Sequence, residues 1–442
     1  MRHFNRTVLM SGLCLLALSG CSWFEADEKP PLPGERMSVL ELQRNLEPAD
    51  VNLTAEGFVA PEPWKNEYWP QAGGYPNHAM QNLALNPGEL KRAWTADTGA
   101  GAEEDLPLTA QPVVFDGKVY TLDTESNVSA FSLQDGKKLW TNFIRPKNED
   151  EQVIGGGLAY SANILYVTNG YNEVLALNPQ NGGIFWRKKL EAPSRAAPTI
   201  MDNRVFVMTL DNRVIALDAK DGKELWSYQG LSETAGLVGA ASPAASSEVV
   251  IPAFSSGEIM ALRVQNGSVA WSDNLSPAVR VGGLSTLPDI QALPILDKGL
   301  VIALSFGGRM AAIDERTGQR IWQRDVSGAD TPWVAGNHLF LTSSANELIA
   351  LGRDSGAIRW VKPLASYVDK DESGTAMDWN GPVFAGGRLI VTGPKGMILE
   401  VDPLDGHLLR RLNTGKAIAA TPIIAQGTLL LLHNDGTLAA YR

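Results

Sequence analysis

The sequence predicts an all-β protein, an eight-bladed β-propeller with its ring closed by an N-terminal strand, and three observations support this. A pattern of four short strands recurs from residue 109 onward. Most copies contain an alanine at a fixed place, then a glycine turn, and end in a tryptophan. Ala130 and Ala440 are 310 residues apart over seven intervals. The resulting period of about 44 residues is typical of a four-stranded propeller blade.

Each part of the repeat has a physical role, which the first copy, Thr109 to Trp140, illustrates. Asp-Gly and Asn-Gly pairs provide the positive φ that tight hairpins require. Strands rich in Val, Ile and Leu on both faces suit sheets stacked between other sheets. The alanine leaves room for a flat indole between blades. The closing tryptophans are Trp140, Trp186, Trp226, Trp271, Trp322 and Trp360.

The seventh and eighth copies depart from the pattern. Copy seven has Glu400 in place of the alanine and Arg410 in place of the tryptophan, so a looser contact between blades is expected there. Copy eight stops at Arg442, after its third strand. The segment from Gly88 to Trp94 resembles the missing fourth strand, and its pairing with the C-terminus would remove open sheet edges. Residues 87–442 are therefore predicted to form one propeller domain.

The N-terminus has the features of a lipoprotein signal peptide, predicted over residues 1–20. Arg2 and Arg6 precede an apolar stretch that ends in Leu18-Ser19-Gly20-Cys21. Small residues before a cysteine suit lipoprotein signal peptidase, so Cys21 is predicted to be acylated and to anchor the chain to a membrane. Ser22 after the cysteine favours the outer membrane. The alternative is an ordinary secretory signal with a chance cysteine. Residues 21–86 are rich in proline and are predicted to form an extended tether.

Composition excludes several kinds of function. A net charge of −11 disfavours binding of nucleic acid, because few cations are left to neutralise phosphates. The two cysteines, Cys14 and Cys21, both lie in the N-terminal segment, so no disulfide or thiolate metal site is expected after residue 21. The remaining histidines lack metal-ligand spacing. No enzymatic activity, metal or cofactor is predicted.

The repeats resemble those of pyrroloquinoline-quinone enzymes. The resemblance rests on Ala216-Leu217-Asp218, Asp221-Gly222-Lys223 and Trp226, and on Trp69-Pro70-Gln71 with Gly73-Gly74. It implies a quinoprotein dehydrogenase as one alternative. Such enzymes commonly stack the cofactor on a disulfide of adjacent cysteines, which the folded part of this chain lacks.

The combination of lipobox, proline-rich tether and eight cysteine-free blades resembles the BamB family of outer-membrane assembly lipoproteins. The resemblance covers the whole chain. It implies a lipid-anchored scaffold of the β-barrel assembly (BAM) complex on the periplasmic face of the outer membrane. The implied partners are the POTRA domains of BamA and unfolded outer-membrane proteins. A periplasmic propeller that binds another protein or ligand is the second alternative.

The same resemblance implies a partner-binding face made of two neighbouring loops. The first loop corresponds to Ala235–Gly239, where Leu237 matches the family and Ala235 and Val238 replace a leucine and an arginine. The second corresponds to Asp289–Gln291, where Asp289 matches and Gln291 departs. Because the family's arginine is missing, apolar contact through Leu237 and Val238 is expected to contribute more. Arg280, between the two loops, is a candidate substitute cation.

Overall fold

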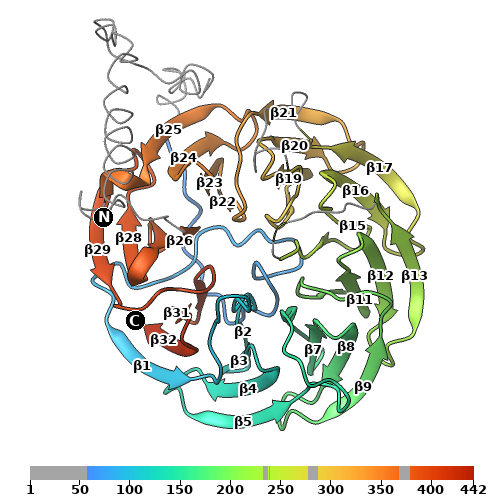
Figure 1. The fold of residues 1–442 in the computed structure, drawn as a ribbon. Coiled ribbons are helices and arrows are strands. Elements are labelled where there is room, and N and C mark those ends of the chain that lie inside the picture. Colours follow the sequence, from blue (N-terminus) through green and yellow to red (C-terminus); the bar gives the residue numbers. More distant parts are fainter. Residues whose placement is uncertain (1–56, 232–236, 238, 277–286, 368–378) are drawn as a thin grey trace, which may run out of the picture. The chain divides into compact units, whose positions relative to one another are not determined.

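A computed structural model describes residues 57–231, 237, 239–276, 287–367 and 379–442. Contacts divide the chain into two units, Met1–Asn45 and Leu46–Arg442, and every described residue belongs to the second. This unit is built of eight four-stranded antiparallel sheets, and Figure 1 shows them arranged in a ring. The predicted eight-bladed β-propeller is therefore confirmed. No helix among the described residues is long and apolar enough to cross a membrane.

Each blade runs from an innermost strand outward. Blades one to four comprise β2 (Val113–Phe115), β3 (Lys118–Leu122), β4 (Asn127–Ser132) and β5 (Lys138–Phe143); β6 (Gly157–Ser161), β7 (Ile164–Asn169), β8 (Glu173–Leu177) and β9 (Ile184–Lys189); β10 (Thr199–Met201), β11 (Arg204–Met208), β12 (Arg213–Asp218) and β13 (Glu224–Gln229); β14 (Ala244–Ala245), β15 (Val249–Ile251), β16 (Glu258–Arg263) and β17 (Val269–Asn274).

The second half of the ring repeats this order, with two short 3-10 helices added. Blades five to eight comprise β18 (Ile295–Asp297), β19 (Leu300–Leu304), β20 (Met310–Asp314) and β21 (Arg320–Arg324); β22 (Trp333–Ala335), β23 (His338–Thr342), β24 (Glu347–Gly352) and β25 (Ile358–Pro363); β26 (Asn380–Ala385), β27 (Arg388–Gly393), β28 (Met397–Val401) and β29 (Leu408–Asn413); β30 (Ile423–Ala425), β31 (Thr428–Leu432), β32 (Thr437–Tyr441) and β1 (Arg92–Asp97). The 3-10 helices are η2 (Leu364–Tyr367) and η3 (Pro394–Gly396).

In seven of the eight blades, a tryptophan on the outermost strand joins the blade to the next. It stands opposite the repeat's alanine, as in the pair Ala216↔Trp226. Its Nε1–H donates to a backbone carbonyl of the following blade at 2.7 to 3.2 Å for Trp94, Trp140, Trp186, Trp226, Trp271, Trp322 and Trp360. The glycine of the next turn lies under the indole: a Cβ on Gly136 would be 2.5 Å from Trp94 Cε3. The register thus places the small alanine side chain across from the indole.

In blade seven, a pair of charged side chains takes the place of the alanine and the tryptophan. This corrects the expectation that the contact between blades is looser there. Glu400 and Arg410 occupy the paired positions of the alanine and the tryptophan. Glu400 is fully buried, is bonded to Arg410, and has Arg388 Nε 2.8 Å from its Oε2. Arg410 also donates to the Pro87 carbonyl at 2.7 Å. The guanidinium therefore makes the inter-blade hydrogen bond that an indole makes elsewhere.

Blade eight takes its strands from both ends of the described chain. β1 pairs antiparallel with β32, in register from Trp94↔Ala440 to Asp97↔Thr437. Lys91 and Arg442 add two backbone hydrogen bonds of 2.9 Å beyond the strand. The fourth strand of this blade is thus the segment that follows the expected tether.

The last thirty residues of that tether, 57–86, belong to the propeller unit, and we call them the N-terminal strap. The strap crosses the middle of the ring in Figure 1. It is hydrogen-bonded to the innermost strand or the following turn of every blade, through Trp69 to Val114, Pro70 to Tyr160, Gln71 to Ile200, Pro76 to Ala245, Asn77 to Leu296, Gln81 to Gly336, Leu83 to Phe384 and Gly386, and Asn66 to Ile424 and Gln426. The compact unit therefore begins before residue 87, the boundary expected from the repeats.

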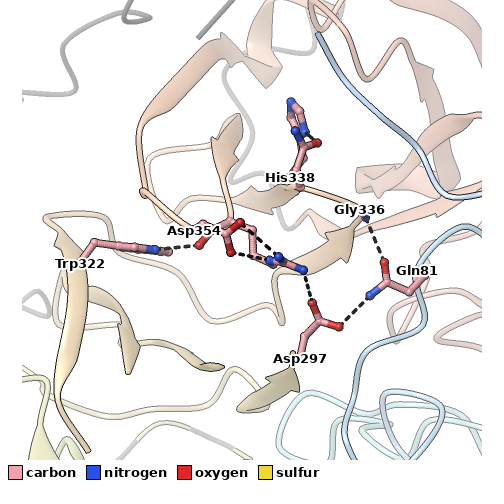
Figure 2. Close-up of polar contacts among 8 residues, drawn as sticks. Gln81, Asp297, Trp322, Gly336, His338 and Asp354 are labelled. Carbon is pink, nitrogen blue, oxygen red and sulfur yellow. Dashed lines mark hydrogen bonds and ion pairs between the residues drawn. The ribbon is translucent and has the colours of Figure 1, made fainter. Parts of the chain in front are cut away.

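One polar network shows how the strap joins neighbouring blades (Figure 2). Gln81 donates to Asp297 of blade five at 2.9 Å and accepts from the Gly336 N–H of blade six at 3.0 Å. Arg353, whose carbonyl accepts from Trp322, pairs with the other oxygen of Asp297 at 2.8 Å. The side chains of Gln81, Asp297 and Arg353 thus supply hydrogen-bond partners for one another, as is usual for buried polar groups.

Strand direction separates two faces of the ring. Antiparallel order places the turns between first and second strands, and between third and fourth, on one face. The strap is bonded at the carboxyl ends of the innermost strands, so it lies on that side, which we call the strap face. The second-to-third-strand turns and the connections between blades lie on the opposite side, the loop face.

Candidate partner-binding site

The predicted site residues that the structure describes lie on the loop face. Leu237 is on the connection into blade four, and Asp289 and Gln291 are on the connection into blade five. Val238, Arg280 and Cys21 lie outside the described residues. Of the five predicted partner-binding residues, three can therefore be placed.

Among the described residues, a hydrogen bond joins the two predicted loops. The Leu237 N–H donates to Asp289 Oδ2 at 2.8 Å. Asp289 is 5% exposed, and burial raises the pKa of its carboxyl above the ordinary value. A carboxylate in this position holds the neighbouring loop and presents little of itself to a partner.

Residues of blade five also bond to the connection that carries Asp289. The Phe306 N–H donates to the Asp289 carbonyl at 2.9 Å, and Ser305 Oγ donates to the Pro288 carbonyl at 3.0 Å. Asp289 is thus fixed by groups from two directions. The backbone of Leu237 is fixed with it, while the Leu237 side chain is only half-buried.

A hollow of about 190 Å³ lies beside this junction. Its walls come from Leu237 and Asp289, from the β11–β12 turn at Thr209 and Asn212, and from Arg195 on the connection into blade three. Arg195 is the only Lys, Arg or His among the described residues that line it. Sequence reasoning missed Arg195, because no motif surrounds it.

Gln291 belongs to a different cavity. It lines a central space of about 310 Å³, to which every blade contributes residues that precede or begin its innermost strand. Trp69, Gly73 and His78 of the strap also line this space, so the strap forms part of its wall. Gln291 therefore does not share the Leu237–Asp289 hollow, although Arg195 lines both cavities.

The described residues contain one cluster with the donor atoms of a metal site. Asp402, Asp405 and His407 bring three such atoms within 4.8 Å of one another on the β28–β29 turn. Asp402 accepts the Leu404 N–H, and Asp405 accepts from His407, whose backbone N–H is the main cause of a lowered Asp405 pKa. The same turn in blade three makes the equivalent bonds with Asp218 and Asp221. The cluster is therefore a feature of the turn.

Comparisons with known proteins agree with this architecture. A family model described as outer membrane protein assembly factor BamB matches residues 124–362, more than half of the chain. The chain is 24% identical to outer membrane protein assembly factor BamB of Yersinia pestis over 358 residues, which cover 79% of this chain and 88% of that protein.

Solved structures show the same fold. The crystal structure of BamB from Moraxella catarrhalis matches with a TM-score of 0.68 and 20% identity, covering 80% of this chain and all of that one. A quinohemoprotein alcohol dehydrogenase from Pseudomonas putida matches with a TM-score of 0.64 and 13% identity, covering 85% and 80%. At these identities the likenesses concern the fold alone, and they include an enzyme. It is the match over residues 124–362 that decides the family: the chain belongs to the family of outer membrane protein assembly factor BamB.

Proposed function

We propose that this chain is a non-enzymatic scaffold subunit of the BAM complex. It is anchored by an acylated Cys21 to the periplasmic face of the outer membrane. It binds the POTRA domains of BamA through the loop face and assists the folding and insertion of outer-membrane proteins. Family membership supports the general role. The single observation that carries the choice of surface is the hydrogen bond from Leu237 to Asp289, which joins the two candidate loops.

The anchor can be tested separately from the partner. Replacement of Cys21 by Ala removes the thiol that the lipid would occupy. The variant is expected to leave the outer-membrane fraction and to appear in the soluble periplasmic fraction or to be retained with an uncleaved signal. An unchanged distribution would contradict the lipid anchor.

Partner binding is tested by capture of BamA from detergent-solubilised envelopes with the tagged full-length chain. Leu237→Glu places a charge on the half-buried side chain at the junction and is expected to reduce capture. Leu225→Glu is the matched control, because Leu225 is 44% exposed on the outer strand β13, away from the loops. If the wild type captures no BamA, the alternative of another periplasmic partner or ligand becomes the better explanation. Equal capture by all three proteins would leave the function and reject the surface.

A further inference from the structure

Among the described residues that line the hollow beside the Leu237–Asp289 junction, Arg195 is the one cation, and its hydrogen-bonding capacity is unused. The hollow's other polar side chains are occupied within the protein. Thr209 donates to Asp211 and to the Arg213 carbonyl, and Asn212 donates to the Leu231 carbonyl while it accepts from Ser255. Within the described part of the chain, the Arg195 side chain has no hydrogen bond or ion pair.

Two other arginines of the loop face contrast with Arg195. Arg187 pairs with Glu173 and donates to the Ile144 carbonyl, and Arg213 pairs with Glu191. Arg195 is only half-buried, so solvent or a partner can reach it. A guanidinium carries five N–H donors in a planar fork that matches a carboxylate. An unused fork at the wall of a hollow is therefore suited to an anionic group from outside the chain.

We propose that Arg195 binds a carboxylate side chain of the protein partner, and that Asp289 positions the Leu237 loop beside it without touching the partner. This inference rests on the proposed function, because it names the chemistry of the partner surface. It also assigns different roles to two residues of one hollow: Arg195 makes the contact, while the buried Asp289 fixes the backbone that forms the wall.

The charge of the chain makes such a contact selective. The chain carries a net charge of −11, so contacts between an acidic partner and the acidic residues of this chain are unfavourable. The Arg195 guanidinium offers an attractive contact at the wall of the hollow, which favours one position and orientation for an acidic side chain.

The test measures binding of the detergent-solubilised full-length lipoprotein to BamA at low and at moderate salt. Arg195→Glu is expected to weaken binding about tenfold or more, because it replaces attraction by repulsion. Arg195→Gln is expected to weaken binding less and to flatten its salt dependence, and it serves as the second variant if the reversal disturbs folding. Arg263→Glu is the matched control, since Arg263 is exposed at the end of β16 on the strap face.

Asp289 is tested by two substitutions that separate positioning from contact. Asp289→Asn keeps an acceptor for the Leu237 N–H and is expected to change affinity less than threefold, roughly within the range of a neutral rim change. Asp289→Ala removes the acceptor and is expected to weaken binding more. A large loss with Asp289→Asn would show that its charge meets the partner and would overturn the assigned role.

The outcomes distinguish this inference from the proposed function. Binding by the wild type and by Arg263→Glu, with loss in Arg195→Glu, supports both. Binding that is equal in the wild type, Arg195→Glu and Arg195→Gln rejects the role of Arg195 and leaves the scaffold function intact. Absence of binding by the folded wild type rejects the proposed function, and the inference falls with it.

Discussion

The two faces of the ring differ in the contacts that hold their segments together. On the strap face, one continuous segment is bonded to all eight blades and buries Trp69, Met80 and Leu83 to 1% exposure or less. On the loop face, separate connections between blades are joined by hydrogen bonds such as that from Leu237 to Asp289. One face is therefore tied to all eight blades by a single segment, while on the other face Arg195 has no side-chain hydrogen bond or ion pair among the described residues. From this difference we expect the strap to contribute most to stability and the loops to contribute most to the proposed recognition.

Deletion of the strap is expected to have the largest effect, and it tests whether the strap stabilises the ring. Deletion of residues 57–86 removes at least one bond from every blade and uncovers the core around Trp69. The variant is expected to lose cooperative thermal unfolding, as followed by circular dichroism, and to become sensitive to proteases. A cooperative transition within about 5 °C of the wild type, which corresponds to roughly 4 kcal/mol or less for a unit of this size, would show that the ring is stable without the strap.

The next largest effect is expected at Glu400, which pairs with Arg388 and holds Arg410 against Pro87, between the strap and β1. Glu400→Gln leaves Arg388, which is 2% exposed, without a counter-charge. Breaking a buried ion pair in this way costs about 3–5 kcal/mol, because the remaining charge stays desolvated. Urea unfolding of the full-length chain measures this loss in the free energy of unfolding. Glu191→Gln is the control on the loop face. The Glu191 side chain is 79% exposed beside Arg213, so its replacement should lower the free energy of unfolding by no more than about 1 kcal/mol. Similar losses in the two variants would remove the contrast between the regions.

The strap also predicts a loss of stability in acid. Burial lowers the pKa of His78 to about 4, and its Nδ1 donates to the Pro294 carbonyl at 2.7 Å. The folded state thus disfavours the proton that the unfolded chain takes up near pH 6.5. Stability from this group is complete above about pH 6.5 and declines as the pH falls towards 4, by roughly 3 kcal/mol in total.

His78→Asn isolates this contribution. Asn tolerates the φ of +58° at this position and can donate to the same carbonyl. Urea midpoints at pH 7 and pH 4.5 should therefore differ less in the variant than in the wild type. Some acid sensitivity should remain, because burial also lowers the pKa of His338, to about 3. An identical pH dependence in the two proteins would contradict the assignment to His78.

Features of the repeat could be predicted from sequence because they are local and periodic. The pairing of alanine with tryptophan follows from hairpins whose turns are visible in the chain, and the structure shows it in blade after blade. The exception at Glu400 and Arg410 was visible as a break in the pattern, yet its consequence was not. It depends on Arg388 and on Pro87, which lies 323 residues from Arg410.

The strap and Arg195 show why the rest could not be predicted. Strap contacts join residues far apart in sequence, such as Asn66 and Ile424, and many of them use backbone groups that any residue supplies. Arg195 stands out by lining the hollow without a side-chain bond among the described residues, which only the folded arrangement reveals. Asp289 lies on the loop face beside Leu237, but its burial alters the role that its charge suggested.

The smallest expected effect on stability concerns the acidic run on the loop face. Glu103, Glu104 and Asp105 are exposed, and replacing all three by Ser changes the net charge from −11 to −8. Unfolding free energy should change by less than about 0.5 kcal/mol, as for ordinary surface substitutions. Association with an acidic partner surface should become faster, by roughly twofold or more at low salt, because repulsion near the docking face falls. A faster rate at unchanged stability would place recognition in the loops and stability elsewhere. A large loss of stability would show that the loop face also supports the ring.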